Sequence, residues 1–368
     1  MSVKGERTYR IGVIPGDGIG PEVVRQGLRV LERASQLAEF SYELVEYPWN
    51  SQLYLDSKQL MPESMLDEYR TLDALYLGAL GDPRVERGLI ERSVIMTLRL
   101  GLDLYINLRP VVLYAEHLCP LKGIQPADID MAVVRENTED CYVGIGGTLR
   151  AGTPDETAIA EMIYTRRGVE RAVRYAFELG RARDKQRTVT LVDKSNAVRA
   201  QEIWRRTFAE VGAEYPDIGR DELYVDTAAM LMISAPRRFD VIVTTNLFGD
   251  ILTDLGAAIQ GGLGSAASGN IHPGQVSMFE PIHGSAPDIA GQNRASPVGA
   301  IAAMGMLLDY LGERRAAVSI EAAIRSLLVT RQIPSVQADS GLTTDRVGDL
   351  VLAALETPVI DLPSDQPV

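Results

Sequence analysis

Residues 241–256, which read VIVTTNLFGDILTDLG, decide how this chain is expected to fold. The stretch opens with the β-branched run VIVTT, a composition typical of a buried strand. Asn246 and Gly249 interrupt that run, and helical character begins at Asp250. We therefore predict a buried strand followed closely by a helix, the alternation from which α/β proteins are built.

Asp250 and Asp254 stand four residues apart, so their side chains lie on one face of the predicted helix. Like charges at this spacing repel each other. Ile251, Leu252 and Leu255 are expected to face the core, which puts the acid pair at the edge of a cleft. A bound cation explains the pair best. The alternative is two solvated acids favoured by the helix dipole in a first turn.

The composition limits the class of protein. A chain of 368 residues can form two domains with sizeable cores, and 46% hydrophobic and 24% charged residues are typical of a soluble globular protein. The net charge of −13 argues against a nucleic-acid partner, because phosphate binding needs a basic surface. A local arginine cluster could still bind an anionic substrate.

Location and redox state follow from what the sequence lacks. Residues 1–10 contain no apolar signal region, and no run approaches 18 apolar residues, so we predict a cytoplasmic protein with no membrane span. The two cysteines, Cys119 and Cys141, have no CxxC partner, and we expect free thiols.

A glycine-rich turn follows the first predicted strand. Residues 10–15 (RIGVIP) are expected to form a strand, residues 16–20 (GDGIG) a tight turn, and Pro21 begins a helix. The spacing G-x-G-x-G lacks the third glycine of the dinucleotide-binding fingerprint. The turn is therefore interpreted as the lip of a cleft, with a Rossmann-type site as the weaker alternative.

Three arginines form a candidate anion site. Predicted strands at 104–108 and 129–134 end at Arg109 and Arg135, and Arg99 lies shortly upstream. Ligands bind at the carboxyl ends of strands in open α/β sheets, and arginine grips carboxylates through paired hydrogen bonds. A polycarboxylate ligand is favoured, and three unrelated surface arginines are the alternative.

Other segments are assigned more briefly. Predicted strands at 188–193 and 223–226 lead to Lys194 and Asp226, and residues 144–156 are expected to leave the body of the fold as a hairpin arm. Residues 260–270 are predicted to be a flexible loop, residues 279–291 a loop of small residues able to approach a phosphate, and residues 357–368 a frayed tail.

Six motifs together resemble the β-decarboxylating dehydrogenases, the isocitrate/isopropylmalate dehydrogenase family. They are PGDGIGPEV, LRLGLDLYINLRP, VRENTEDCY, VDKSN, NLFGDILTDLG and EPIHGSAPDIAG, in order from residue 15 to residue 291. The resemblance implies a two-domain α/β fold with a large mixed sheet flanked by helices, not a Rossmann fold. It also implies a cofactor-side domain (1–104 and 262–368) and a dimerisation and substrate–metal domain (105–261) with an arm near 143–165.

The resemblance implies a role for each matching residue. Tyr142 and Lys194 would be catalytic. The metal ligands for Mg²⁺ or Mn²⁺ would be Asp226, Asp250 and Asp254. Substrate would be bound by Arg99, Arg109, Arg135, Ser93, Val94, Ile95, Met96 and Asn196. The NAD-binding residues would be Glu280, His283, Gly284, Ser285, Ala286, Asp288, Ile289 and Ser296.

Two of these positions bear on the cofactor. Asp288 suits a free ribose 2′-hydroxyl and repels a 2′-phosphate, which favours NAD over NADP. Ser296 stands where the family usually has an adenine-contacting asparagine. Lys194 and Asp226 would enter the site from the partner subunit, so the resemblance implies a homodimer.

The implied reaction is NAD-dependent oxidative decarboxylation of a (2R)-malate-type acid. The apolar Val94, Ile95 and Met96 suit an isopropyl group, so 3-isopropylmalate is the leading substrate and leucine biosynthesis the implied pathway. D-Malate or tartrate is the second choice, because CPLKGIQPADID resembles that branch, and isocitrate or another substituted malate the third. A catalytically silent regulatory subunit is the non-enzyme alternative, disfavoured because all catalytic and metal-binding residues are present.

Overall fold

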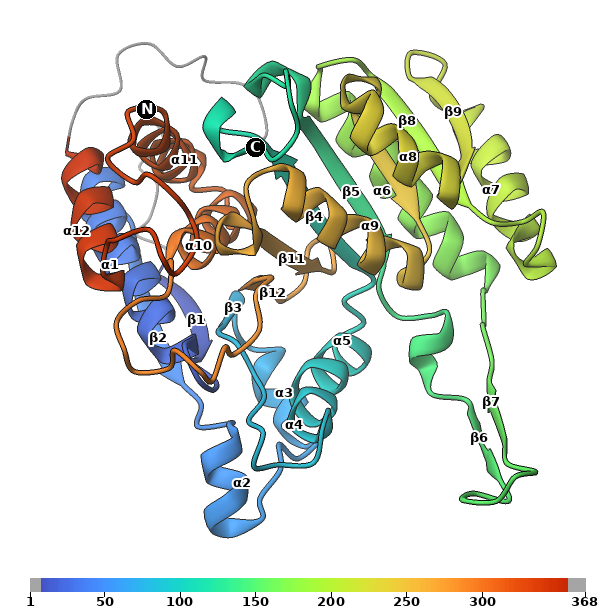
Figure 1. Cartoon of the computed structure of the whole chain (residues 1–368), viewed down its shortest axis with the longest axis horizontal. Helices are drawn as coiled ribbons and strands as arrows, with labels where there is room; N and C mark the ends of the chain where they lie inside the picture. Colours follow the sequence, from blue (N-terminus) through green and yellow to red (C-terminus); the bar gives the residue numbers. More distant parts are fainter. Residues whose placement is uncertain (1–7, 357–368) are drawn as a thin grey trace.

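The computed structural model describes residues 8–356, which surround one ten-stranded sheet (Figure 1). The strands are, in spatial order, β2 (Ser41–Glu46), β1 (Thr8–Ile14), β3 (Ala74–Leu77), β12 (Ser277–Pro281), β11 (Ala267–Ile271), β4 (Ile106–Val112), β5 (Asp130–Glu136), β10 (Val241–Thr244), β8 (Thr188–Asp193) and β9 (Gly219–Tyr224). Both outer parts of the sheet are parallel, whereas the three pairings around β11 and β4 are antiparallel. The predicted large mixed sheet is confirmed.

Helices cover both faces of the sheet and bury its apolar side chains. One core cluster joins α1 (Gly20–Ala38), α10 (Val298–Tyr310), α11 (Arg314–Val329) and α12 (Thr344–Leu355) to α6 (Arg166–Arg183) and α7 (Glu202–Gly212). The other clusters involve short helices near β3, namely α2 (Ser51–Ser57), α3 (Met65–Tyr69), α4 (Leu89–Glu91) and α5 (Thr97–Gly101), and the pair α8 (Val225–Ser234) and α9 (Asn246–Ile259). The predicted helix-flanked α/β architecture is therefore confirmed.

The predicted strand–helix unit at 241–256 is present as β10 and α9, with two corrections. The helix begins at Asn246, so Gly249 lies inside it and does not interrupt it. Leu252 is buried as expected, but Ile251 is 57% exposed and does not face the core. A helix that starts earlier than predicted keeps Asp250 and Asp254 on one face, because their spacing is unchanged.

The predicted loop at 260–270 is wrong in its second half, because residues 267–271 form the central strand β11. Every residue of β11 is buried, and the strand pairs with β12 and β4. Its sequence, ASGNI, lacks the β-branched run of a typical strand; Gly269 is needed because a Cβ there would lie 2.9 Å from Phe279 Cε1. Likewise, Phe279, Glu280 and Pro281 belong to β12, not to the predicted loop.

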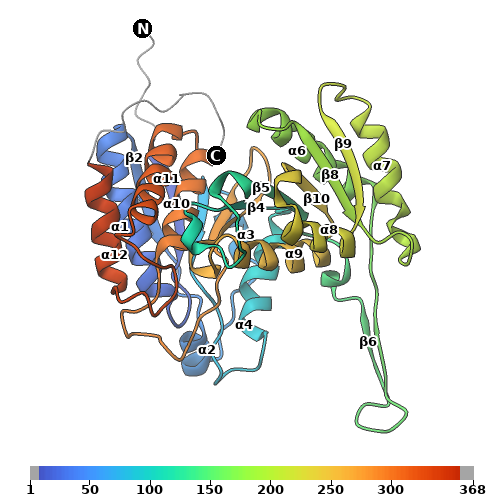
Figure 2. The same cartoon turned by 45° about the horizontal axis from the view of Figure 1, so that its top comes forward.

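A two-stranded hairpin projects from the body of the molecule (Figure 2). It consists of β6 (Gly146–Leu149) and β7 (Thr157–Ala160), and all eight residues are exposed. We call it the arm. The predicted domain boundaries stay a prediction, although residues 105–261 do supply the five strands from β4 to β9 in the sheet order.

Three further predictions concern the chain ends, membranes and cysteines. The predicted frayed tail, residues 357–368, lies outside the described residues. Among residues 8–356 no helix combines the length and apolar character needed to cross a bilayer. Cys119 and Cys141 are both free thiols, as predicted.

Candidate functional site

Arg109 and Arg135 come together on the face of the sheet that α9 covers (Figure 1). Each was predicted to lie at the carboxyl end of a strand, but β4 and β5 are antiparallel and Arg109 lies inside β4. The real reason is register: Arg135 lies opposite Asn107, two residues from Arg109, so both arginines point to one face. Arg135 donates to Asn246 Oδ1 at 2.9 Å and also binds Asp250.

Arg109 connects the sheet to both acids of α9. Its Nη atoms lie 3.6 Å from Asp250 Oδ1 and 3.5 Å from Asp254 Oδ1, and Nη1 donates to Thr253 Oγ1 at 2.5 Å. Burial, with the nearby charge of Arg135, lowers the pKa of Arg109 to about 10. The guanidinium remains charged at neutral pH and is held in place for an anion.

Arg99, on α5, completes a cluster of three buried arginines. Its Nε donates to Asn270 Oδ1 at 3.0 Å and its Nη2 to Glu280 Oε1 at 3.3 Å. Burial lowers the pKa of Arg99, and the charge of Arg135 contributes in the same direction. We call Arg99, Arg109 and Arg135 the arginine cluster. Such concentrated positive charge fits a ligand with more than one carboxylate.

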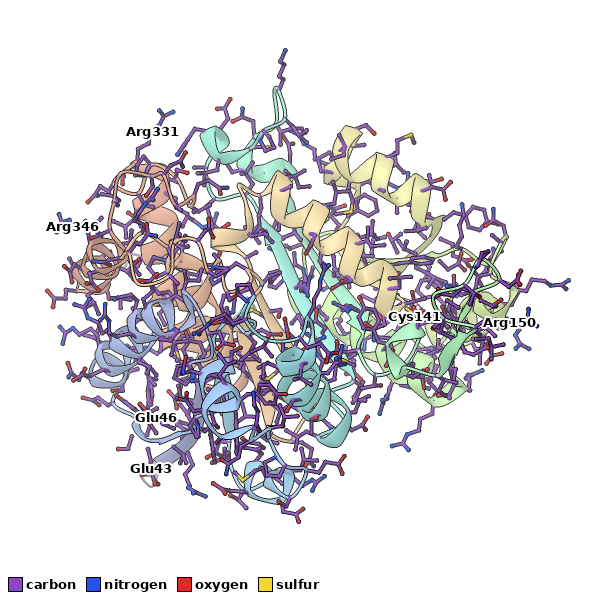
Figure 3. The ribbon with its side chains drawn as sticks, turned by 60° about the horizontal axis from the view of Figure 1, so that its bottom comes forward. Glu43, Glu46, Cys141, Arg150, Arg331 and Arg346 are labelled. Atoms are coloured by element: carbon purple, nitrogen blue, oxygen red, sulfur yellow. The ribbon has the colours of Figure 1, made fainter. Side chains whose placement is uncertain are left out.

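Tyr142 faces this cluster from the short 3₁₀ turn Cys141–Val143, which precedes the arm. Its hydroxyl donates to Asp250 Oδ2 at 3.0 Å, and the Arg135 guanidinium lies 5.2 Å from its ring centre. Burial and the neighbouring Asp250 raise the pKa of Tyr142, so its hydroxyl keeps its proton at neutral pH. In Figure 3 Cys141 and Arg150, which lies in the arm's loop, share one side of the molecule.

The acids of α9 have the character of a cation site. Burial opposes ionisation of Asp250, but Arg135 and Arg109 outweigh it and lower the pKa of that carboxyl. The pKa of Asp254 is raised by burial and further by the charge of Asp250. A divalent cation bound between two crowded carboxylates would relieve this repulsion, and oxygen ligands suit Mg²⁺ or Mn²⁺.

Lys194 and Asp226 lie together but apart from the acid pair. Lys194 Nζ donates to Asp226 Oδ1 at 2.5 Å, and this bond lowers the pKa of Asp226. Asp226 is in the first turn of α8, just past the end of β9 at Tyr224, and not in the strand as predicted. Residues 8–356 of a single chain contain no group of three potential metal ligands. One subunit alone therefore does not assemble the three predicted carboxylates.

The three apolar residues predicted to contact the substrate side chain, Val94, Ile95 and Met96, do not all face the same way. Residues Arg92–Met96 form a π-helical turn, a geometry often found at functional sites. Val94 is 2% exposed and packs in the core, so it does not face a ligand, whereas Ile95 and Met96 are half-buried. Ser93 Oγ accepts a hydrogen bond from the Met61 backbone N–H at 3.2 Å. Val94 thus packs in the core beneath this turn, and Ile95 and Met96 are the candidates for substrate contact.

The glycine turn at 16–20 packs against the predicted cofactor loop. Ile19 N donates to Ser285 O at 2.9 Å, and a Cβ on Gly18 would lie 2.0 Å from that oxygen. Asp17 fixes the turn by accepting hydrogen bonds from Ser51 and from the Gly81 backbone N–H. The turn therefore packs directly on the predicted cofactor loop, and its place at the lip of a cleft stays a prediction.

Within the predicted cofactor loop, Asp288 and Gly284 are exposed, and His283, Ser285, Ala286, Ile289 and Ser296 are half-buried. His283 Nδ1 lies 3.1 Å from Gly284 O, and burial lowers the pKa of His283, so the ring is neutral at pH 7. Ser296 Oγ donates to Gly264 O at 3.3 Å. Glu280 lies on β12 and contacts Arg99, so it links the loop to the arginine cluster. Asn196 is exposed and follows Lys194 by two residues in the segment after β8.

The polar residues that support the site were not predicted from the sequence. Asn107, Asn137 and Asn270 form a buried hydrogen-bonded group beneath Arg99, and Thr253 binds Arg109. One signal was available: an asparagine inside an otherwise apolar strand, as in YINL, is costly to bury unless it has partners.

Comparisons with known proteins identify the family and the fold. The family model described as isocitrate/isopropylmalate dehydrogenase matches residues 10–351. The chain is 50% identical over 328 residues to a 3-isopropylmalate dehydrogenase of Thermobifida fusca (88% of this chain, 92% of that protein) and 49% identical over 348 residues to one of Frankia casuarinae (94% and 99%). The crystal structure of isocitrate dehydrogenase from Methylococcus capsulatus superposes with a TM-score of 0.85 at 35% identity, covering 95% of this chain and 100% of that one.

Proposed function

The chain belongs to the isocitrate/isopropylmalate dehydrogenase family, and from this premise we propose that it oxidises and decarboxylates 3-isopropylmalate with NAD, releasing CO₂ and 4-methyl-2-oxopentanoate. Family and relatives indicate a decarboxylating dehydrogenase. The observation that carries the proposal is the meeting of the arginine cluster, two acids and Tyr142 at one place.

In this proposal the arginine cluster binds the two carboxylates of the malate skeleton. Arg99 and Arg109 hydrogen-bond to the neutral side chains of Asn270 and Thr253. Each also lies near carboxylates, Arg99 at 3.3 Å from Glu280 and Arg109 at 3.6 and 3.5 Å from Asp250 and Asp254, and a bound cation on the two aspartates would leave more of the Arg109 charge for the substrate. Both residues are buried, and charge–charge attraction is stronger in such a site than in water. The cluster thereby fixes the substrate next to Tyr142 and Asp250.

The metal and cofactor would be held by residues already described. Asp250 and Asp254, with Asp226 of a second subunit, would hold Mg²⁺ or Mn²⁺, and the loop after β12 would hold NAD. When bound, the cation would stabilise negative charge on the substrate's 2-oxygen, and NAD would accept the hydride. Lys194, as the neutral amine, would accept the hydroxyl proton, and Tyr142, protonated at neutral pH, would deliver a proton to C3 after CO₂ leaves.

A homodimer is part of the proposal, because Lys194 and Asp226 do not reach the acid pair of their own chain. Exposed apolar side chains occur on the two neighbouring helices and on the arm: Met230 and Ile233 of α8, Ile251 of α9, and Ile145, Leu149 and Ile159 at the arm. Exposed apolar groups on two adjacent helices and on a projecting hairpin favour contact with another protein surface. The predicted cytoplasmic location stays a prediction.

The choice of 3-isopropylmalate rests on the names of the relatives and on Ile95 and Met96. Two half-buried apolar side chains suit an isopropyl group, whereas a third carboxylate would need a polar partner. The test is a panel of kcat/KM values with NAD⁺ and Mg²⁺ for 3-isopropylmalate, D-malate, tartrate, isocitrate and homoisocitrate. We expect 3-isopropylmalate to lead. A tenfold or greater preference for D-malate would show that the substrate assignment is wrong.

A further inference from the structure

Asn270 is the polar centre of a buried network beneath the arginine cluster. Its Oδ1 accepts hydrogen bonds from Arg99 Nε, Asn107 Nδ2 and Asn137 Nδ2, each at 3.0 Å, and its Nδ2 donates to Glu280 Oε1 at 2.8 Å. The Asn270 side chain is 0% exposed. One amide group therefore contacts both a predicted substrate residue and a predicted cofactor residue.

These bonds fix the orientation of the Arg99 guanidinium. Asn270 holds Nε, and Glu280 holds Nη2 at 3.3 Å. In residues 8–356 the remaining nitrogen, Nη1, has no protein hydrogen-bond partner. Because a guanidinium is planar, two fixed nitrogens determine where the third one points. Rotation of Arg99 is thus restricted, and Nη1 is left for a ligand.

The amide at position 270 suits this task better than a carboxylate. An amide oxygen accepts from Arg99 without cancelling its charge, and the amide nitrogen can also donate to Glu280. An aspartate at 270 would neutralise Arg99 and repel Glu280 across a short buried distance. Asparagine therefore orients both charged groups without adding a second carboxylate to the one, Glu280, that already pairs with Arg99.

We propose that Asn270 is a positioning residue that orients Arg99 toward a substrate carboxylate and Glu280 toward the cofactor. The inference rests on the proposed dehydrogenase function. It adds to that function a residue whose backbone lies in β11, a strand separate from α5 and β12, which carry the two groups it orients.

The main test compares Asn270→Ala with Asn107→Ala. Asn107 is equally buried, lies opposite Asn270 in the sheet register and donates to it, but hydrogen-bonds to neither Arg99 nor Glu280. We expect N270A to lower kcat/KM for 3-isopropylmalate by about 10- to 100-fold, the loss typical of a hydrogen bond to a charged group. KM and the NADH dissociation constant, measured by fluorescence titration, should both rise. N107A should lose stability and change these constants by a clearly smaller factor than N270A, because it removes one hydrogen bond to Asn270 and none to Arg99 or Glu280.

Two further variants test whether the effect passes through Arg99. In an Arg99→Lys background, which lacks the guanidinium, N270A should lower kcat/KM for 3-isopropylmalate by a much smaller factor than it does in wild type. Asn270→Asp, which keeps the side-chain shape, should be impaired at neutral pH and recover relative to wild type as pH falls, because protonation restores a neutral group.

The outcomes separate the two proposals. Equal kinetic constants for N270A and N107A, additive losses in the Arg99→Lys cycle, or an Asn270→Asp variant whose relative activity ignores pH would each overturn the role of Asn270. If N270A does not fold, the pH dependence of Asn270→Asp activity, relative to wild type, tests the role of Asn270 instead. Wild-type protein that turns over none of the five acids would overturn the proposed function instead. The NADH dissociation constants of wild type and N270A would then still test whether Asn270 positions Glu280.

Discussion

The side chain of Arg135 runs directly beneath Gly249 of α9, and a Cβ built on that glycine would lie 2.5 Å from Arg135 Cγ. The helix can approach the sheet this closely only because residue 249 has no side chain. That approach brings Asp250 into contact with both Arg135 and Tyr142. The geometry of the site therefore depends on a residue that has no functional group.

We predict that Gly249→Ala lowers both activity and stability. Alanine is favoured over glycine in a helix by about 1 kcal/mol, but a methyl group at 249 must displace Arg135 or α9. We expect a net loss of about 1–3 kcal/mol in the free energy of unfolding, with a fall in kcat/KM. Urea unfolding and steady-state kinetics measure these quantities.

Gly305→Ala in α10 is the matched control. Its added Cβ would meet nothing closer than 3.5 Å, so the helix-propensity gain should appear without a clash. If G249A is as stable and as active as G305A, the close approach of α9 is not required.

The pair Val94→Ala and Ile95→Ala should separate support from recognition. Val94 is in the core, so V94A is expected to cost about 2 kcal/mol of stability and leave the order of preferred substrates unchanged. Ile95 is half-buried, so I95A should reduce the preference for 3-isopropylmalate over D-malate. The ratio of kcat/KM values for the two acids is the measurement. A change in this ratio for V94A alone would reverse our assignment.

Cofactor preference should follow the charge at position 288. We expect wild-type protein to prefer NAD⁺, and Asp288→Arg to raise kcat/KM with NADP⁺, because an arginine attracts the 2′-phosphate that aspartate repels. Asp67→Arg makes the same charge change at an exposed position on α3. An equal rise in kcat/KM with NADP⁺ in the two variants would indicate a general effect of charge and not a local contact at position 288.

A shared active site predicts complementation between inactive subunits. Tyr142→Phe and Lys194→Ala homodimers should each be inactive, yet mixing them with subunit exchange should restore part of the activity, because some mixed sites contain both wild-type residues. Assays before and after exchange, with heterodimer formation followed by mass spectrometry, measure the recovery. Exchange without any recovery would count against sharing.

Glu136, at the end of β5 behind the arginine cluster, should make stability depend on pH. Burial raises its pKa to about 7, above the ordinary value of 4.5, although Thr138 and Glu139 donate hydrogen bonds to it. The folded state therefore holds a proton that the unfolded chain releases. This contribution is complete below pH 4.5 and is lost as pH rises to about 7, by about 3 kcal/mol at most.

The measurement for Glu136 is urea unfolding of wild type and Glu136→Gln between pH 5 and pH 8. The glutamine carries no titrating proton, so the stability difference between wild type and variant should shift in favour of the variant as pH rises. A difference that stays constant over this range would contradict the raised pKa.

The sequence predicted those parts of the molecule whose signals are local. The β-branched run of β10 and the spacing of Asp250 and Asp254 depend only on neighbouring residues, so both were recognised. Arg109 and Arg135 were correctly predicted to lie together, but for the wrong reason. The antiparallel register of β4 and β5 brings them together, and the sequence of neither strand alone specifies that register.

The remaining features depend on residues far apart in the chain. β11 looked like a loop because Gly269 and Ser268 are small, and their burial is decided by Phe279 and other neighbours. The separation of Val94 from Ile95 depends on the π-helical turn that carries them. Neither can be read from a pattern of apolar residues, since tertiary contacts override local preference.

The position of β11 and β12 also has a consequence for synthesis. These strands separate β3 from β4, although residues 267–281 leave the ribosome long after both of those neighbours. Until then β3 and β4 have open edges that can pair with other chains, and Arg99 lacks Asn270 and Glu280. An interrupted translation product would therefore be prone to aggregation and would have no partial activity.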